Sequence, residues 1–269
     1  MNNLFDDKGR RIPFSGMRVF NKTCNWYYQL KQPEINYLSI LERSQKYSEV
    51  PTTIKRNDFE GKCLELMDQI QNDQILKNLF AGVHVPFIAP IASKQKDIGL
   101  ILEKSLLPSV AKSFTNKFPN LHCKAILQGS SKLEGELKIN KQSRYQNLLN
   151  AQKKGPIVGW YFPQVLQEYD QNSQRKQMET LPNTTNICLS GHVDIASVIV
   201  GTPDLLIHEE KYPPVLCLSA VQHNDPKLML CFKAYGHHLE FWCMSQMLTP
   251  DVIQVSEQWS GGLTLFSNI

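Results

Sequence analysis

The strongest constraint on the fold is a group of three apolar segments close together in the C-terminal half. They are ICLSGHVDIASVIV (187–200), DLLIHEE (204–210) and VLCLSAVQ (215–222). Each is rich in aliphatic residues, and turn-forming residues separate them, which is typical of strands. Strands must pair, and the resulting sheet must bury a face against another layer. We therefore predict a sheet built from these segments.

Helical periodicity is clearest in residues 225–249. Asp225 stands in the N-cap position and Pro226 at the first helical position, which is a typical helix start. Five apolar residues then recur at 4-3-4-3 spacing and share one helical face: Leu228, Phe232, Tyr235, Leu239 and Trp242. We predict one long helix here.

The remaining periodicity divides the chain near residue 155. Four shorter segments are predicted to be helical: 59–80, 97–118 with an interruption at Pro108, 143–155 and 163–171. A final hairpin is predicted over 251–269, where a Gly-Gly pair separates two strand-like runs. We predict a mainly helical N-terminal region over 1–155 and an α/β domain over 156–269, with a mixed sheet flanked by helices.

The charge of the chain is unevenly distributed. The formal net charge is +4, yet residues 94–154 hold 12 Lys and Arg against 4 Asp and Glu, an excess of +8. Such a basic segment favours a partner with phosphates, either nucleic acid or an anionic membrane. It is also typical of a solvated face without a partner. The candidate nucleic-acid contacts are Lys132, Lys138, Lys141, Arg144, Lys153 and Lys154.

The cysteines and the apolar runs indicate the cellular compartment in which we expect the protein. The seven cysteines are odd in number and none has CxxC spacing, so neither a zinc site nor a disulfide framework is predicted. The first 20 residues contain Asp6 and Asp7 and no apolar run, so we expect no secretory signal. The longest apolar stretch, 79–93, contains two prolines and is too short to span a bilayer. We expect a soluble intracellular protein, cytoplasmic or nuclear.

Residues 160–269 resemble the restriction-endonuclease-like, or PD-(D/E)XK, nuclease superfamily. The resemblance depends on GTPDLLI, the HEEKYPP turn, VLCLSAVQ, the predicted helix containing AYGHHLEFW and the final hairpin. It implies a sheet whose carboxylates bind Mg²⁺, which activates a water for phosphodiester hydrolysis. Asp204 would be the first carboxylate, and Glu168, on the preceding predicted helix, matches a second.

The same resemblance shows which catalytic groups are missing. Cys217 stands where the family has Asp or Glu, and Ser219 stands where it has Lys. Cysteine is a soft ligand that suits zinc or copper rather than magnesium, and serine supplies no cation. Glu209 begins an E-x-K triplet, but its odd offset from Asp204 would place the two carboxylates on opposite faces of a strand. We expect a degenerate core with no metal and no cofactor, in which Asp204 can simply be a turn residue.

A second pair of residues suggests a different chemistry. NKTCNWYYQL and SGHVDIASVIVG resemble the cysteine and histidine segments of papain-like amidohydrolases, with Cys24 as nucleophile and His192 as base. Asp194 or Glu209 would orient the imidazole. The alternative is a buried thiol and a histidine satisfied by the backbone.

These observations favour a non-catalytic binding protein on a degenerate nuclease-like scaffold. Its partner would be nucleic acid, through the basic segment, or a protein, through the sheet and the long helix. Two enzymatic alternatives remain open: a metal-dependent nuclease using Asp204 and Glu168, and a cysteine amidohydrolase using Cys24 and His192.

Overall fold

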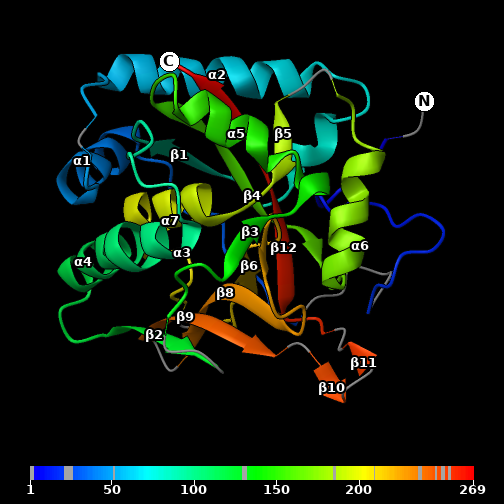
Figure 1. The fold of residues 1–269 in the computed structure, drawn as a ribbon. Helices are drawn as coiled ribbons and strands as arrows, with labels where there is room; N and C mark the ends of the chain where they lie inside the picture. Colours follow the sequence, from blue (N-terminus) through cyan, green and yellow to red (C-terminus); the bar gives the residue numbers. More distant parts are fainter. Residues whose placement is uncertain are drawn as a thin grey trace.

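The chain forms an α/β structure in which helices flank a mixed, largely antiparallel sheet (Figure 1). This confirms the predicted fold class at that level. The computed structural model describes residues 3–20, 27–50, 52–128, 132–183, 186–208, 210–235, 238–245, 247–249, 252–253 and 256–269. In the described residues, no helix is both long and apolar enough to cross a membrane.

Helices and strands are interspersed from α1 to α7, and the described elements after α7 are strands. The α-helices are α1 (Tyr37–Tyr47), α2 (Arg56–Gln71), α3 (Ile98–Ile101), α4 (Leu107–Lys117), α5 (Tyr145–Gln152), α6 (Gln171–Lys176) and α7 (His192–Gly201). The short 3-10 or π turns are η1 (Lys77–Ala81), η2 (Leu102–Leu106), η3 (Lys141–Ser143) and η4 (Gln177–Glu179). The strands are β1 (Val85–Ala89), β2 (Cys123–Leu127), β3 (Leu137–Ile139), β4 (Ile157–Gln167), β5 (Ile187–Leu189), β6 (Val215–Cys217), β7 (Val221–His223), β8 (Leu228–Tyr235), β9 (His238–Ser245), β10 (Met247–Thr249), β11 (Val252–Ile253) and β12 (Trp259–Asn268).

One eight-stranded sheet organises the fold. Its order is β1-β4-β12-β6-β8-β9-β2, and β5 also pairs with β12. β12 runs parallel to β6, and β9 runs parallel to β2, whereas the other pairs in this sheet are antiparallel. β1 and β2 precede residue 155 and yet pair with β4 and β9. The predicted boundary at residue 155 therefore falls inside one sheet.

Helices cover both faces of strand β4, because consecutive residues of a strand point to opposite faces. Trp160 points toward α2, where its Nε1 donates a hydrogen bond to the carbonyl oxygen of Cys63 at 2.8 Å. The neighbouring Tyr161 is buried within electrostatic range of Asp194, near the start of α7. Strand β4 is thus enclosed between α2 on one face and α7 on the other.

The predicted long helix over 225–249 is wrong, because this segment forms β8, β9 and β10. The side chains of Met229, Leu230, Cys231 and Phe232 are all buried, so β8 is covered on both faces. A strand buried on both faces is apolar at nearly every position, and such a run also contains residues at helical spacing. Asp225 caps a turn instead, where its Oδ1 accepts a hydrogen bond from the Lys227 amide at 2.9 Å.

Four other predicted elements differ from the structure. Residues 163–167 belong to strand β4 and not to a helix. The predicted strand over 187–200 divides into β5 and the helix α7, all of whose residues are buried, and periodicity cannot separate a buried helix from a buried strand. Residues 203–206 form turns and not a strand. The predicted final hairpin is absent from the described residues, because β12 continues through the Gly-Gly pair and pairs with β4, β5 and β6.

The helices predicted near 59–80 and 143–155 are confirmed as α2 and α5. The helix predicted over 97–118 is confirmed as the consecutive α3, η2 and α4, although Pro108 lies in the first turn of α4 and does not interrupt it. The segment 215–222 does contain strands, although they are two short ones, β6 and β7.

Candidate functional site

Asp204, the first predicted metal ligand, lies in the turn that follows α7. Its Oδ2 accepts a hydrogen bond from the Nζ of Lys117 at 2.7 Å, and its side chain is 41% exposed. The interpretation of Asp204 as a turn residue is confirmed. Its carboxylate already has a cation as its partner, supplied by the C-terminal turn of α4.

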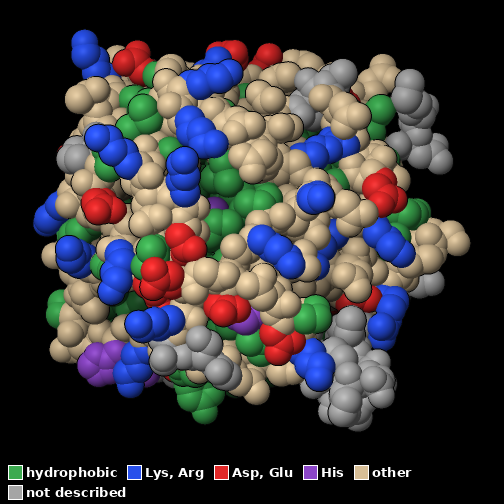
Figure 2. Space-filling view, in the orientation of Figure 1, with side chains coloured by type: hydrophobic (Ala, Val, Ile, Leu, Met, Phe, Trp, Pro, Cys, Tyr) green, Lys and Arg blue, Asp and Glu red, His purple; other side chains and the backbone are tan. Residues whose placement is uncertain are grey.

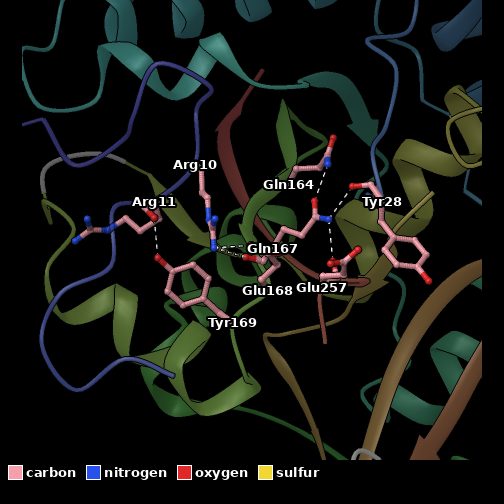
Figure 3. Close-up of polar contacts among 8 residues, drawn as sticks. All are labelled: Arg10, Arg11, Tyr28, Gln164, Gln167, Glu168, Tyr169 and Glu257. Carbon is pink, nitrogen blue, oxygen red and sulfur yellow. Dashed lines mark hydrogen bonds and ion pairs between the residues drawn. The ribbon is translucent and has the colours of Figure 1, made fainter. Parts of the chain in front are cut away.

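Glu168, the second predicted ligand, lies just after β4, and its side chain is fully buried. Its Oε2 forms an ion pair with the Nη2 of Arg10 at 2.8 Å (Figure 3). Tyr169 donates a hydrogen bond from its hydroxyl to the carbonyl oxygen of Arg11 at 2.7 Å. Two successive residues after β4 therefore fasten the N-terminal segment to the sheet, which is a structural role for this carboxylate.

A glutamine pair extends this polar cluster (Figure 3). Gln164 donates from its Nε2 to the Oε1 of Gln167 at 2.6 Å. The Nε2 of Gln167 donates to the carbonyl oxygens of Tyr28 at 2.8 Å and Glu257 at 2.9 Å. Buried polar groups are costly when unpaired, so these bonds specify how three distant parts of the chain meet.

Cys217 and Ser219 also have structural surroundings. Burial raises the pKa of the Cys217 thiol to about 12, so this group is neutral near pH 7 and is a poor ligand for a hard cation. Ser219 is fully buried and donates its hydroxyl hydrogen bond to the Oε1 of Gln174. Within the described ranges, no group of three or more His, Cys, Asp and Glu side chains is placed to hold a metal ion. The residues present therefore do not fit the magnesium site that the resemblance implies.

His192 begins α7, and its side chain is 1% exposed. Burial lowers the pKa of this imidazole to about 3, so it is neutral near pH 7. Its Nδ1 has no hydrogen-bond partner among the described residues. Cys24 and Glu209 lie outside the described residues, so the proposed contacts of these two with His192 stay predictions.

Asp194 does not orient that imidazole, because its carboxylate has other partners. Its Oδ1 accepts hydrogen bonds from the Tyr145 hydroxyl at 2.7 Å and the Gly191 amide at 2.9 Å, and its Oδ2 accepts one from Thr264. Tyr145 in turn accepts a hydrogen bond from the Val193 amide at 2.9 Å. Burial is the main cause that raises the pKa of Asp194 to about 6.

This Asp194 cluster fixes the start of α7 against α5 and β12. Sequence reasoning missed it, although Asp194 stands three residues after Gly191, the spacing of an acidic residue that caps its own helix.

The basic segment separates into exposed lysines and one structural arginine. Lys132, Lys138, Lys141, Lys153 and Lys154 are exposed. Arg144 instead donates from its guanidinium to the carbonyl oxygens of Met178, Leu181 and Pro182. That guanidinium, predicted to contact nucleic acid, is therefore already engaged within the chain.

Figure 2 shows the charged side chains on one face of the molecule. Lys and Arg side chains are spread across this face, and a smaller group of acidic side chains interrupts them.

Comparisons of the chain with family models, with curated proteins and with solved structures find no match. Evidence for function therefore comes from the residues of this chain alone.

Proposed function

We propose that this protein is a non-catalytic binding protein that contacts the phosphates of nucleic acid through exposed lysines of segment 94–154. One observation carries the proposal. Lys138, Lys141 and Lys154 are exposed, and none forms an ion pair with a carboxylate in the part of the chain that the structure describes. Such ammonium groups are available to displace the counterions of a phosphate backbone.

The aromatic side chains of this segment favour phosphate contacts over contacts with bases. Phe114 and Tyr145 are fully buried in the core, and Phe118 is half-buried. Proteins that stack bases present exposed aromatic rings along a basic groove. We therefore propose binding that depends on charge and salt and has little dependence on nucleotide sequence.

The non-catalytic part of the proposal is supported by the partners of the candidate groups. The carboxylates of Asp204 and Glu168 are paired with Lys117 and Arg10. The resemblance to the nuclease superfamily depended on a strand at Asp204 and on a long helix after residue 225, and the chain forms neither. The proposal therefore depends on the surface charge and not on a nuclease-like scaffold.

The test measures binding of labelled single-stranded and duplex oligonucleotides by fluorescence anisotropy over a range of salt concentrations. The variant replaces Lys138, Lys141 and Lys154 with Gln. If each lysine contacts one phosphate, the slope of log K against log salt becomes shallower by about 0.9 per lysine on duplex DNA, or roughly 3 in total.

A matched control removes three positive charges elsewhere, at Lys31, Lys55 and Lys77, which are also exposed. We expect this variant to keep the wild-type slope. Equal slopes for all three proteins, or no binding at low salt, would contradict the proposal and favour a protein partner. Cleavage of the oligonucleotide with Mg²⁺ that is lost in Asp204→Ala would contradict its non-catalytic part.

A further inference from the structure

A cavity of about 580 Å³ opens between α5 and α7 and is bordered by α3, η2 and the loop before α3. This volume lies within the range of small-molecule sites. Much of its wall is aliphatic, including Ile98, Ile101, Leu106, Leu149, Val193 and Val200. Figure 2 shows hydrophobic side chains in a hollow between α5 and α7, with basic side chains around it. The lining therefore suits an apolar body.

His192 lines this cavity as well. Its side chain is almost completely buried, and its Nδ1 has no hydrogen-bond partner in the described part of the chain. The great majority of buried polar side-chain atoms have such a partner. A ligand with a hydroxyl or carbonyl group in the cavity would supply the missing hydrogen bond, because neutral imidazole can donate or accept.

The charged side chains that line the cavity are mainly basic. Lys94, Lys96 and Lys153 line the cavity and are exposed. The acidic residue in the lining is Glu49. None of the three lysines forms an ion pair within the described ranges of the chain. The exposed edge of an apolar cavity is thus positively charged, which favours an anionic group on the ligand.

We propose that this cavity binds a fatty-acid-like anion, whose aliphatic chain packs along α7 and α3 and whose carboxylate meets the lysines. A second polar group on the chain hydrogen-bonds to His192. An aliphatic chain matches the aliphatic wall better than a nucleotide, whose sugar and phosphates would be desolvated against it. This proposal is independent of the nucleic-acid proposal. It depends on the cavity and on Lys94, Lys96 and Lys153. The nucleic-acid proposal depends on three other lysines of the same segment 94–154.

The first experiment tests the charge of the ligand by isothermal titration calorimetry. We expect dodecanoate to bind the full chain and dodecylammonium, which has the same aliphatic chain and the opposite charge, to bind much more weakly. Replacing Lys94, Lys96 and Lys153 with Gln should weaken dodecanoate binding about tenfold, because three exposed ion pairs each contribute modestly. The Lys31/Lys55/Lys77 triple variant is the matched control and should bind as the wild type does.

The second experiment places the ligand in the cavity. Ile98 is half-buried in the wall, so Ile98→Trp adds bulk to the cavity and should abolish dodecanoate binding. Leu64→Trp adds a similar side chain on the exposed face of α2, outside the cavity, and should leave binding unchanged. Circular dichroism and the thermal midpoint of each variant show that it remains folded.

The third experiment addresses His192 with a series of ω-hydroxy acids from octanoate to tetradecanoate. At the length that reaches His192, the hydroxy acid should bind more tightly than the unsubstituted acid, and His192→Leu should remove this difference. Absence of dodecanoate binding, equal binding of dodecylammonium, or binding insensitive to Ile98→Trp would overturn the proposal. A series without any preferred hydroxy acid would overturn the role of His192. Loss of nucleic-acid binding in the Lys138/Lys141/Lys154 variant with retained dodecanoate binding would separate the two proposals.

Discussion

Replacing Asp194 with Asn should change how the stability of this protein depends on pH. The Asp194 carboxylate is fully buried and accepts hydrogen bonds from Tyr145, Gly191 and Thr264. Burial nevertheless dominates and raises its pKa from 3.8 to about 6. An asparagine at this position has nearly the same shape and no charge, so it removes the titration and preserves most of the packing.

The sign of the effect follows from proton binding. Between pH 3.8 and about 6 the folded protein holds a proton on Asp194 that the unfolded chain has lost. The stability that Asp194 contributes is therefore fully present below pH 3.8 and is lost as the pH rises through about 6. The difference of 6 − 3.8 = 2.2 pH units corresponds to about 3 kcal/mol at 1.36 kcal/mol per unit.

Urea unfolding, followed by tryptophan fluorescence at several pH values between 4 and 7, measures this effect. The free energy of unfolding of the wild type minus that of Asp194→Asn should be about 2.4 kcal/mol more positive at pH 4 than at pH 7, because part of the full effect is already lost at pH 4, just above 3.8. Other carboxylates cancel in this difference. The exposed Asp58, changed to Asn, controls for the removal of one carboxylate. A difference that is flat, or that grows with pH, would refute the reasoning, because the hydrogen bonds would then outweigh burial.

Three further comparisons test other parts of the structure by urea or thermal unfolding. Glu168→Gln should lower the free energy of unfolding by about 3–5 kcal/mol, because it leaves a buried arginine charge without its carboxylate. Asp204→Asn, which breaks an exposed pair, should cost less than about 1 kcal/mol, and equal costs would contradict the structural role of Glu168. Arg144→Lys should cost about 2 kcal/mol, because an ammonium cannot reach three carbonyl groups as a guanidinium does. Gly159→Ala should cost about 2–3 kcal/mol, because its Cβ would lie 2.0 Å from a backbone oxygen of β12, whereas Gly61→Ala meets nothing within 4 Å and should stabilise α2 by about 0.5–1 kcal/mol.

For the site residues, the sequence predicted only properties that depend on neighbouring residues, and it did not predict partners distant in the chain. The exposure of Lys138, Lys141 and Lys154 agrees with the basic composition of their segment. The partners of Glu168 and Arg144 could not be predicted, because no pattern near either residue indicates that it meets Arg10 or the carbonyl groups in and after η4. The cavity beside His192 could not be predicted either, since α5 and α7 line it from separate parts of the chain.

The sequence by itself determined the amphipathic helices α2 and α5, the buried segments and the α/β class, because these depend on composition and on periodicity within one segment. Only the tertiary structure decided that 192–201 is a helix and that 228–245 is a pair of strands. The segment 192–201 is buried throughout, so local periodicity favours neither form there, and in 228–245 the helical spacing of the apolar residues favours a helix that does not form. The choice depends on hydrogen-bond partners distant in sequence: β8 pairs with β6 and β9 in the sheet, whereas α7 satisfies its own backbone and is fixed by Tyr145 and Thr264.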